Sequence, residues 1–102
     1  MKQQGLINFF YQNEDFIKCP VCGDPYTHQG KIEIFERGED ETQGNHVQVL
    51  DNNIQVDRDL SKNPSPRRQG VSIHFSCEPE SHPFMVDIYQ HKGQTFFEIR
   101  IN

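Results

Sequence analysis

The amino-acid sequence predicts a mainly β protein, an antiparallel sheet with an inserted β-hairpin. Residues 70–77, 83–90 and 95–102 alternate apolar with polar side chains, which is the period of two expected when one face of a strand is buried. Short polar stretches separate the three segments, so they predict a three-stranded antiparallel meander. Residues 1–16 fit a short helix and a strand about equally well, because their apolar residues are only loosely periodic.

Upstream of the meander, the sequence predicts one further strand and one hairpin. The strand is centred on residues 32–35, and the hairpin covers residues 46–60 with its turn at residues 51–53. Asn suits that turn because it tolerates the left-handed backbone conformation that tight hairpins require. Between hairpin and meander we expect a loop, since the prolines and the glycine of SKNPSPRRQG at 61–70 exclude a continuous helix or a central strand.

The composition leaves little material for a hydrophobic core. Only 33% of the 102 residues are apolar and there is no tryptophan, so a covalent or metal cross-link would help the chain to fold. The three cysteines cannot all pair within one chain, and no charged and then apolar leader opens the sequence, so we expect a cytoplasmic protein. No apolar run approaches the roughly 20 residues that span a bilayer, and we expect no membrane partner.

Charge is unevenly distributed along the chain. The formal net charge of -5 disfavours non-specific binding to nucleic acid. Acidic residues dominate from residue 33 to residue 59, whereas Lys62, Arg67 and Arg68 lie in a stretch without any acidic side chain. The acidic run ERGEDE could hold a hard cation, but it lacks the alternation of a calcium loop and is more typical of a solvated link.

The segment CPVCG at residues 19–23 has the spacing of a zinc knuckle. Two thiolates separated by two residues can bind one ion from a tight turn, and Gly23 allows the backbone torsion that closes the turn. A redox-active pair uses the same spacing, but it normally opens a helix in an α/β setting, and the β-rich remainder of this chain opposes that interpretation. We therefore expect Cys19 and Cys22 to bind a metal ion.

Two more ligands are expected at the junction of the first two meander strands, where His82 follows Cys77. Together with Cys19 and Cys22 they would complete a tetrahedral zinc site. His28 remains an alternative fourth ligand, and Cys77 could instead be a buried strand residue with His82 on the surface. Four protein ligands would leave no position for a substrate or an activated water, so we expect a structural zinc ion whose binding contributes directly to folding.

The other three histidines are expected to have no part in the metal site. His46, His74 and His91 lie on or beside predicted strands. At such positions a lone histidine is more often packed or solvent-facing than a ligand.

The order of these features resembles the zinc ribbon, a broad structural family. The resemblance rests on CPVCG, a strand, a long insertion and then IHFSC with a second ligand pair, although CEPESH stands where the family usually has a second Cys-x2-Cys. The segments NPSPRRQG, SIHFSCE and QHKGQT also resemble small uncharacterised bacterial and phage proteins with a zinc-ribbon core. We accordingly divide one domain into an N-terminal arm (1–18), a first knuckle and strand (19–37), an acidic hairpin insertion with the basic loop (38–69), and a second knuckle with the meander (70–102).

Zinc ribbons serve in transcription factors, ribosomal proteins, nucleases and protein-docking modules, so the resemblance alone does not select a function. We expect a non-catalytic protein-interaction module that docks a protein partner or a second copy of itself. The docking surface would be the sheet face bearing Met85, Tyr89 and Phe96, or an edge strand. The sequence identifies no small-molecule substrate.

One alternative is nucleic-acid binding. Arg67, Arg68 and Lys92 would contact phosphates, while Tyr89 or Phe96 would stack on bases. The two arginines could equally pair with carboxylates of the acidic hairpin, as exposed charges often do.

A second alternative is a metal- or His-dependent nuclease, in which His74 and His91 would converge with Arg67 and Arg68. It requires these four side chains to share one face of the sheet. The sequence contains no nucleophile elbow, phosphate loop or dinucleotide-binding fingerprint, so no other catalytic class is indicated.

Overall fold

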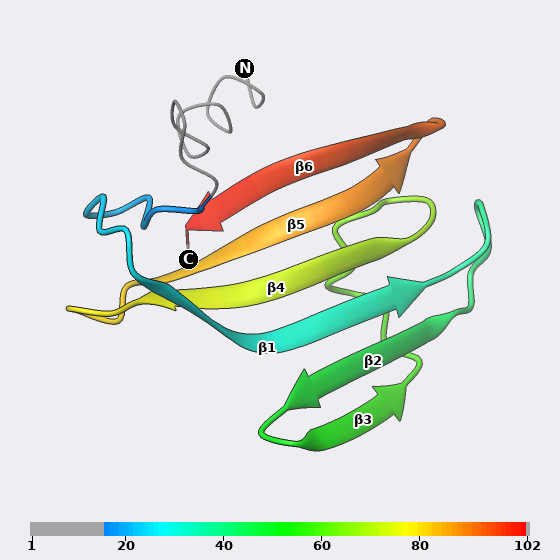
Figure 1. Cartoon of the computed structure of the whole chain (residues 1–102). Helices are drawn as coiled ribbons and strands as arrows, with labels where there is room; N and C mark the ends of the chain where they lie inside the picture. Colours follow the sequence, from blue (N-terminus) through cyan, green and yellow to red (C-terminus); the bar gives the residue numbers. More distant parts are fainter. Residues whose placement is uncertain (1–15, 102) are drawn as a thin grey trace.

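The computed structural model describes residues 16–101, which form one six-stranded antiparallel sheet (Figure 1). The strands are β1 (Thr27–Glu36), β2 (Asn45–Leu50), β3 (Asn53–Asp57), β4 (Gly70–Cys77), β5 (Pro83–His91) and β6 (Gln94–Ile101). Their order across the sheet is β3-β2-β1-β4-β5-β6, which confirms the predicted mainly β fold. The described residues contain no helix, and therefore none that could cross a membrane. The helix or strand predicted for residues 1–16 lies almost wholly outside them.

Two tight turns set the register of the hairpins. Asp51 and Asn52 join β2 to β3 with φ of 51° and 66°, and Lys92 and Gly93 join β5 to β6 with φ of 52° and 79°. Positive φ at both central residues is typical of the two-residue turns whose twist matches that of the paired strands. The predicted hairpin and the predicted β4–β5–β6 meander are both confirmed.

One face of the sheet carries apolar side chains across its whole width, and we call it the apolar face. The strand registers align two rows, each with one side chain per strand. In order from β3 to β6, the rows are Ile54, Val49, Ile32, Ile73, Val86 and Ile99, and Val56, Val47, Ile34, Val71, Ile88 and Phe97. Side chains on one face of adjacent strands pack against each other, so these rows stabilise the sheet.

The apolar face is covered unevenly. On the β4–β6 half, the segment before β1 packs Ile17 against a core cluster that contains Phe84 and Val86. On the β1–β3 half, Ile34, Ile54 and Val56 are 39%, 70% and 63% exposed. The β1–β3 half therefore presents aliphatic side chains to solvent.

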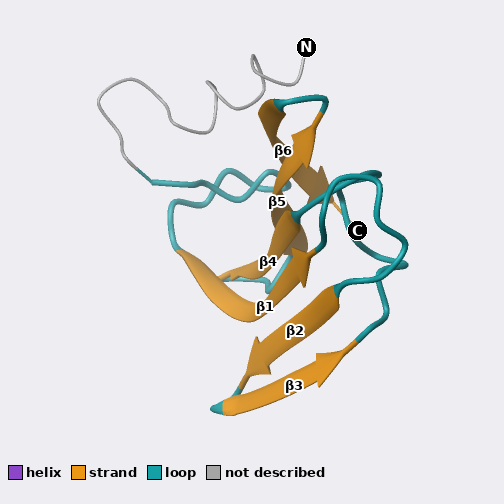
Figure 2. Ribbon diagram, turned by 90° about the vertical axis from the view of Figure 1, so that its right-hand side faces the viewer, coloured by secondary structure: helices purple, strands orange, loops and turns teal. Residues whose placement is uncertain are grey.

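The opposite face carries most of the polar side chains, and we call it the polar face. The loop of residues 58–69 lies on this side of the sheet, which Figure 2 shows nearly edge-on. Ser65 is buried, and its hydroxyl donates to the carbonyl of Gln90 at 2.6 Å and accepts from the backbone N–H of Arg68 at 2.8 Å. The side-chain oxygen of Asn63 accepts the Ser65 N–H at 2.9 Å, so the proline-rich segment is held in one conformation.

Candidate metal centre

Four side chains from separate parts of the sequence meet at one end of the sheet. The ligand atoms of Cys19, Cys22, Cys77 and His82 all lie within 4.8 Å of one another. The Sγ atoms of Cys22 and Cys77 are 3.9 Å apart, and the Nδ1 of His82 is 3.3 Å from Cys77 Sγ and 3.9 Å from Cys19 Sγ. Thiolates about 2.3 Å from a tetrahedral zinc ion would be about 3.8 Å apart, so the spacing fits one ion. All three cysteines are free of disulfides.

The first knuckle is formed by a tight turn just before β1. The Gly23 N–H donates to the carbonyl of Cys19 at 2.8 Å, and the Cys19 N–H donates to the carbonyl of Asp24 at 2.9 Å. Gly23 adopts a φ of 77°, which is the left-handed conformation that favours glycine. Its role in closing the turn is thus as the sequence predicts.

The second knuckle connects β4 to β5 through residues 78–82. The Ser81 N–H donates to the Cys77 carbonyl at 2.9 Å, and Ser81 takes a left-handed φ of 55°. This turn brings the backbone N–H of His82 to 3.3 Å from Cys77 Sγ. The Nε2 of His82 lies 3.4 Å from a carboxylate oxygen of Glu80, so Nδ1 is the nitrogen left to bind a metal.

The centre is continuous with the hydrophobic core. Cys19 and Cys77 are buried and belong to the same cluster as Phe84 and Val86, whereas Cys22 is exposed. A metal ion here would therefore join the first knuckle to the core cluster of the sheet.

The surroundings of the thiols shift their pKa values in opposite directions. The strongest influence on Cys22 is a backbone hydrogen bond from Asp24 that lowers its pKa, but desolvation and the thiols of Cys19 and Cys77 together outweigh it and raise the pKa to about 11. Desolvation is the strongest influence on Cys77 and raises its pKa, but backbone hydrogen bonds from Glu80 and His82 and contacts with the other thiols together outweigh it and lower the pKa to about 7. A bound cation would favour the thiolate at every cysteine.

The alternative ligand, His28, lies outside this group. It is exposed on β1, and its Nε2 lies 3.6 Å from a carboxylate oxygen of Glu78. The geometry therefore favours His82 as the fourth ligand.

Among the basic side chains in the 58–69 loop, that of Arg67 forms an ion pair within residues 16–101. Arg67 donates from Nε and Nη2 to the two carboxylate oxygens of Asp40 at 2.7 and 2.6 Å, which holds the pKa of Asp40 below its usual value. The pairing that the sequence left open is thus formed, among the described residues, by Arg67 alone of the two arginines, with a carboxylate in the link between β1 and β2. Arg68 and Lys92 are exposed.

The aromatic pair proposed for stacking or docking is only partly accessible. Tyr89 is buried, and its hydroxyl donates to Glu98 at 3.1 Å. Phe96 stacks on the Tyr89 ring with centroids 5.5 Å apart and is half-buried. Met85, on the same face, is also buried. The polar face therefore offers less apolar surface than the alternation of residues suggested.

Sequence reasoning missed a buried network on the polar face. Glu33 on β1 accepts hydrogen bonds from His46 Nε2 at 2.8 Å and from His74 Nε2 at 2.7 Å, and His46 Nδ1 lies 2.9 Å from a carboxylate oxygen of Asp57. Phe35 stacks on the His46 ring at 4.5 Å. These residues come from four strands, so only the register of the sheet, which is not visible in the sequence, could have revealed the network.

His74 and His91 do not meet. In the β4–β5 register His74 pairs with Met85, six residues before His91, which corresponds to about 20 Å along a strand. The convergence that a nuclease would need is therefore absent from the described residues.

Comparison of the chain with protein-family models, curated proteins and solved structures finds no significant match.

Proposed function

We propose that the chain is a zinc-stabilised, non-catalytic interaction module of the zinc-ribbon type that associates with a second copy of itself in the cytoplasm. Three thiolates and one imidazole are a donor set that suits zinc. Because four protein ligands fill a tetrahedral site, the ion would support the fold and leave no position for a reacting group.

The observation that carries the interaction proposal is the open edge of β3. All five residues of this strand are exposed, and its pairing with β2 shows no bulge. The strand also lacks proline and lysine, the residues with which natural proteins commonly block pairing at an edge. It is therefore suited to pair with another strand.

A second copy fits this edge because the strand can pair with itself. Antiparallel pairing of two β3 strands about a two-fold axis at Gln55 would place Ile54 of one copy beside Val56 of the other. These two side chains are the most exposed large aliphatic residues of the described chain. Pairing would also join the open β1–β3 halves of two apolar faces into one continuous surface.

The alternatives have less support. With Arg67 bound to Asp40, a nucleic-acid surface would rely on Arg68 and Lys92 against a net charge of -5. The nuclease would need His74 and His91 together, and the register separates them.

Sedimentation velocity over a range of protein concentrations tests the proposal. We expect a monomer–dimer equilibrium for the natural chain and a monomer for the double variant Ile54→Lys/Val56→Lys, because paired lysines at an edge oppose strand pairing. Leu50→Lys is the matched control, since Leu50 is also exposed but lies on the polar face of β2. A monomer at every concentration, or a dimer that the double variant leaves intact, would contradict the proposal.

A further inference from the structure

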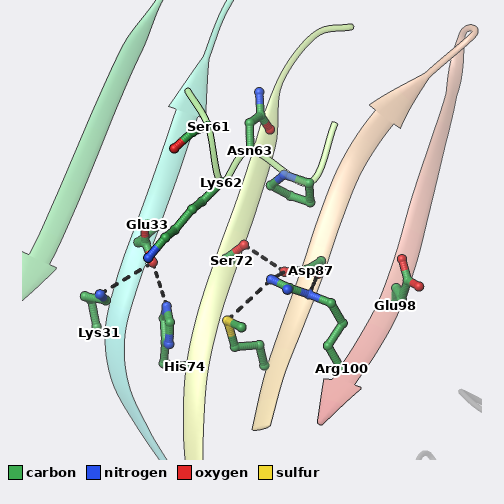
Figure 3. A pocket seen from close by; sticks show the side chains of 12 residues that line it. Lys31, Glu33, Ser61, Lys62, Asn63, Ser72, His74, Asp87, Glu98 and Arg100 are labelled. Atoms are coloured by element: carbon green, nitrogen blue, oxygen red, sulfur yellow. Dashed lines mark hydrogen bonds and ion pairs between the residues drawn. The ribbon is translucent and has the colours of Figure 1, made fainter. Parts of the chain in front are cut away.

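A cavity of about 650 Å³ lies between the polar face and the 58–69 loop (Figure 3). This volume is within the range of roughly 300 to 1,000 Å³ found for small-molecule sites. The cavity shares no residue with the metal centre or with β3. Its charged lining consists of three cationic side chains, Lys31, Lys62 and Arg100, and three carboxylates, Glu33, Asp87 and Glu98.

The floor of the cavity is unusually polar for a chain with so small a core. Glu33, Ser72 and Asp87 are buried on neighbouring strands, where apolar residues of similar size would stabilise the sheet at least as well. Buried charged groups that gather in a cavity are typical of binding sites. The floor therefore indicates a role beyond stability.

The acceptor atoms of the floor already have partners. In Glu33, Oε1 accepts from His74 at 2.7 Å and Oε2 accepts from His46 at 2.8 Å. In Asp87, Oδ1 accepts from the Ser72 hydroxyl at 2.7 Å and Oδ2 accepts from Arg100 Nε. A ligand would find no free carboxylate oxygen on these two residues.

Donors, in contrast, remain available. The ammonium group of Lys31 lies 3.6 Å from Glu33 and keeps N–H groups for another partner. Lys62 extends from the loop across the cavity, and no hydrogen bond or ion pair engages it within residues 16–101 (Figure 3). Arg100 uses Nε and Nη2 for Asp87, which leaves its Nη1 group without a partner in the same part of the chain.

From this imbalance we infer that the cavity binds a small molecule carrying one carboxylate or phosphate group, held by Lys31, Lys62 and Arg100. Charge-assisted hydrogen bonds to such oxygens are stronger than neutral ones. Glu98 lines the same cavity and would repel further negative charge, so the site favours a single anionic group over a polyanion such as nucleic acid.

Titration of the zinc-loaded protein with inorganic phosphate and, separately, with acetate tests the inference by NMR. We expect saturable shifts of the amide signals of residues 31, 62, 74 and 100 with at least one of the two probes. The double variant Lys31→Gln/Lys62→Gln should weaken binding by about tenfold or more. The probe that binds identifies the anionic group.

Lys92→Gln is the matched control, because Lys92 is an exposed lysine in the β5–β6 turn and does not line the cavity. It should leave binding of the probe unchanged. The inference is overturned if neither probe shifts these signals, or if Lys92→Gln weakens binding as much as the double variant. Self-association through β3 is tested separately, so either proposal can fail alone.

Discussion

Glu33→Gln removes the negative charge at the centre of the buried network on the polar face. In the natural chain this carboxylate accepts hydrogen bonds from His46 and His74 at 2.8 and 2.7 Å, with the Lys31 ammonium at 3.6 Å. Both ring nitrogens of His46 face carboxylates, because its Nδ1 lies 2.9 Å from Asp57. The substitution keeps the size of the side chain but leaves these donors with one neutral acceptor.

The expected cost follows from the burial of the pair. Glu33 and His46 are 5% and 6% exposed, and leaving a buried hydrogen-bonding group without its partner typically costs about 1 to 3 kcal/mol, with more for a charged group. Since Gln retains one acceptor oxygen, we expect about 3 kcal/mol at neutral pH. At about 4 to 8 °C per kcal/mol for a domain of this size, Tm should fall by about 12 to 24 °C.

The difference in the free energy of unfolding between the natural chain and Glu33→Gln should depend on pH. Desolvation raises the pKa of Glu33, but hydrogen bonds from His74 and His46 and the charge of Lys31 outweigh it, so the pKa is lowered on folding. A lowered pKa means that the stabilisation is present above the unfolded-state value of about 4.3 and is lost as pH falls through the folded-state value. The two proteins should therefore become more similar in stability below about pH 4.

Urea unfolding followed by circular dichroism at several pH values measures this difference. Glu36→Gln is the control, because Glu36 is exposed on the same strand and should change the free energy of unfolding by less than about 0.5 kcal/mol. A free energy of unfolding within about 0.5 kcal/mol of that of the natural chain at neutral pH would show that the Glu33 carboxylate does not stabilise the fold. A difference that does not narrow on acidification would refute the assignment to the charge of Glu33.

Three further predictions concern the metal centre and the loop. Strong chelation at neutral pH, or Cys19→Ser, should abolish the cooperative thermal melt, because a metal ion bound only by the folded chain would contribute directly to folding. An unchanged melt after verified metal loss would contradict this. Glu80→Gln should lower metal affinity by up to about tenfold, because the Glu80 carboxylate lies beside His82 Nε2 and would orient the ring. Competition with a chelating dye measures the affinity. Equal affinities of the two proteins would show that Glu80 does not have this role. Gly70→Ala should lower the free energy of unfolding measured in urea by about 1 to 3 kcal/mol, because its Cβ would lie 2.5 Å from a side-chain oxygen of the 58–69 loop. Gly30→Ala is the control and should lower it less, because the nearest atom to its Cβ would be 3.7 Å away. Equal losses of stability would contradict the close approach at Gly70.

The strands were predictable because their signals are local. Alternation from residue 70 onward predicts β4, β5 and β6, and Asn52 in the β2–β3 turn adopts the left-handed conformation that its side chain tolerates. The meeting of Cys19, Cys22, Cys77 and His82 was predictable for a similar reason, because each candidate ligand pair lies in one short turn whose spacing is visible in the sequence.

The assignment of the two faces was not predictable from alternation. The alternation along β5 places Met85 and Tyr89 on one face and Val86 and Ile88 on the other, but it does not predict which face a distant loop will cover. The 58–69 loop lies over the polar face, so the exposed aliphatic residues include Ile34 on β1 and Ile54 and Val56 on β3, all on the apolar face. The Glu33 network depends in the same way on cross-strand register, which is set by the whole sheet.

One metal ion is expected to join the two knuckles and so to stabilise a chain with a small core. Elemental analysis of protein purified without chelators measures the metal content, and native mass spectrometry gives the number of ions per chain. We predict one zinc ion per chain for the natural protein and none for a Cys19→Ser/Cys77→Ser variant. A folded natural protein that contains neither zinc nor a comparable metal would contradict the account.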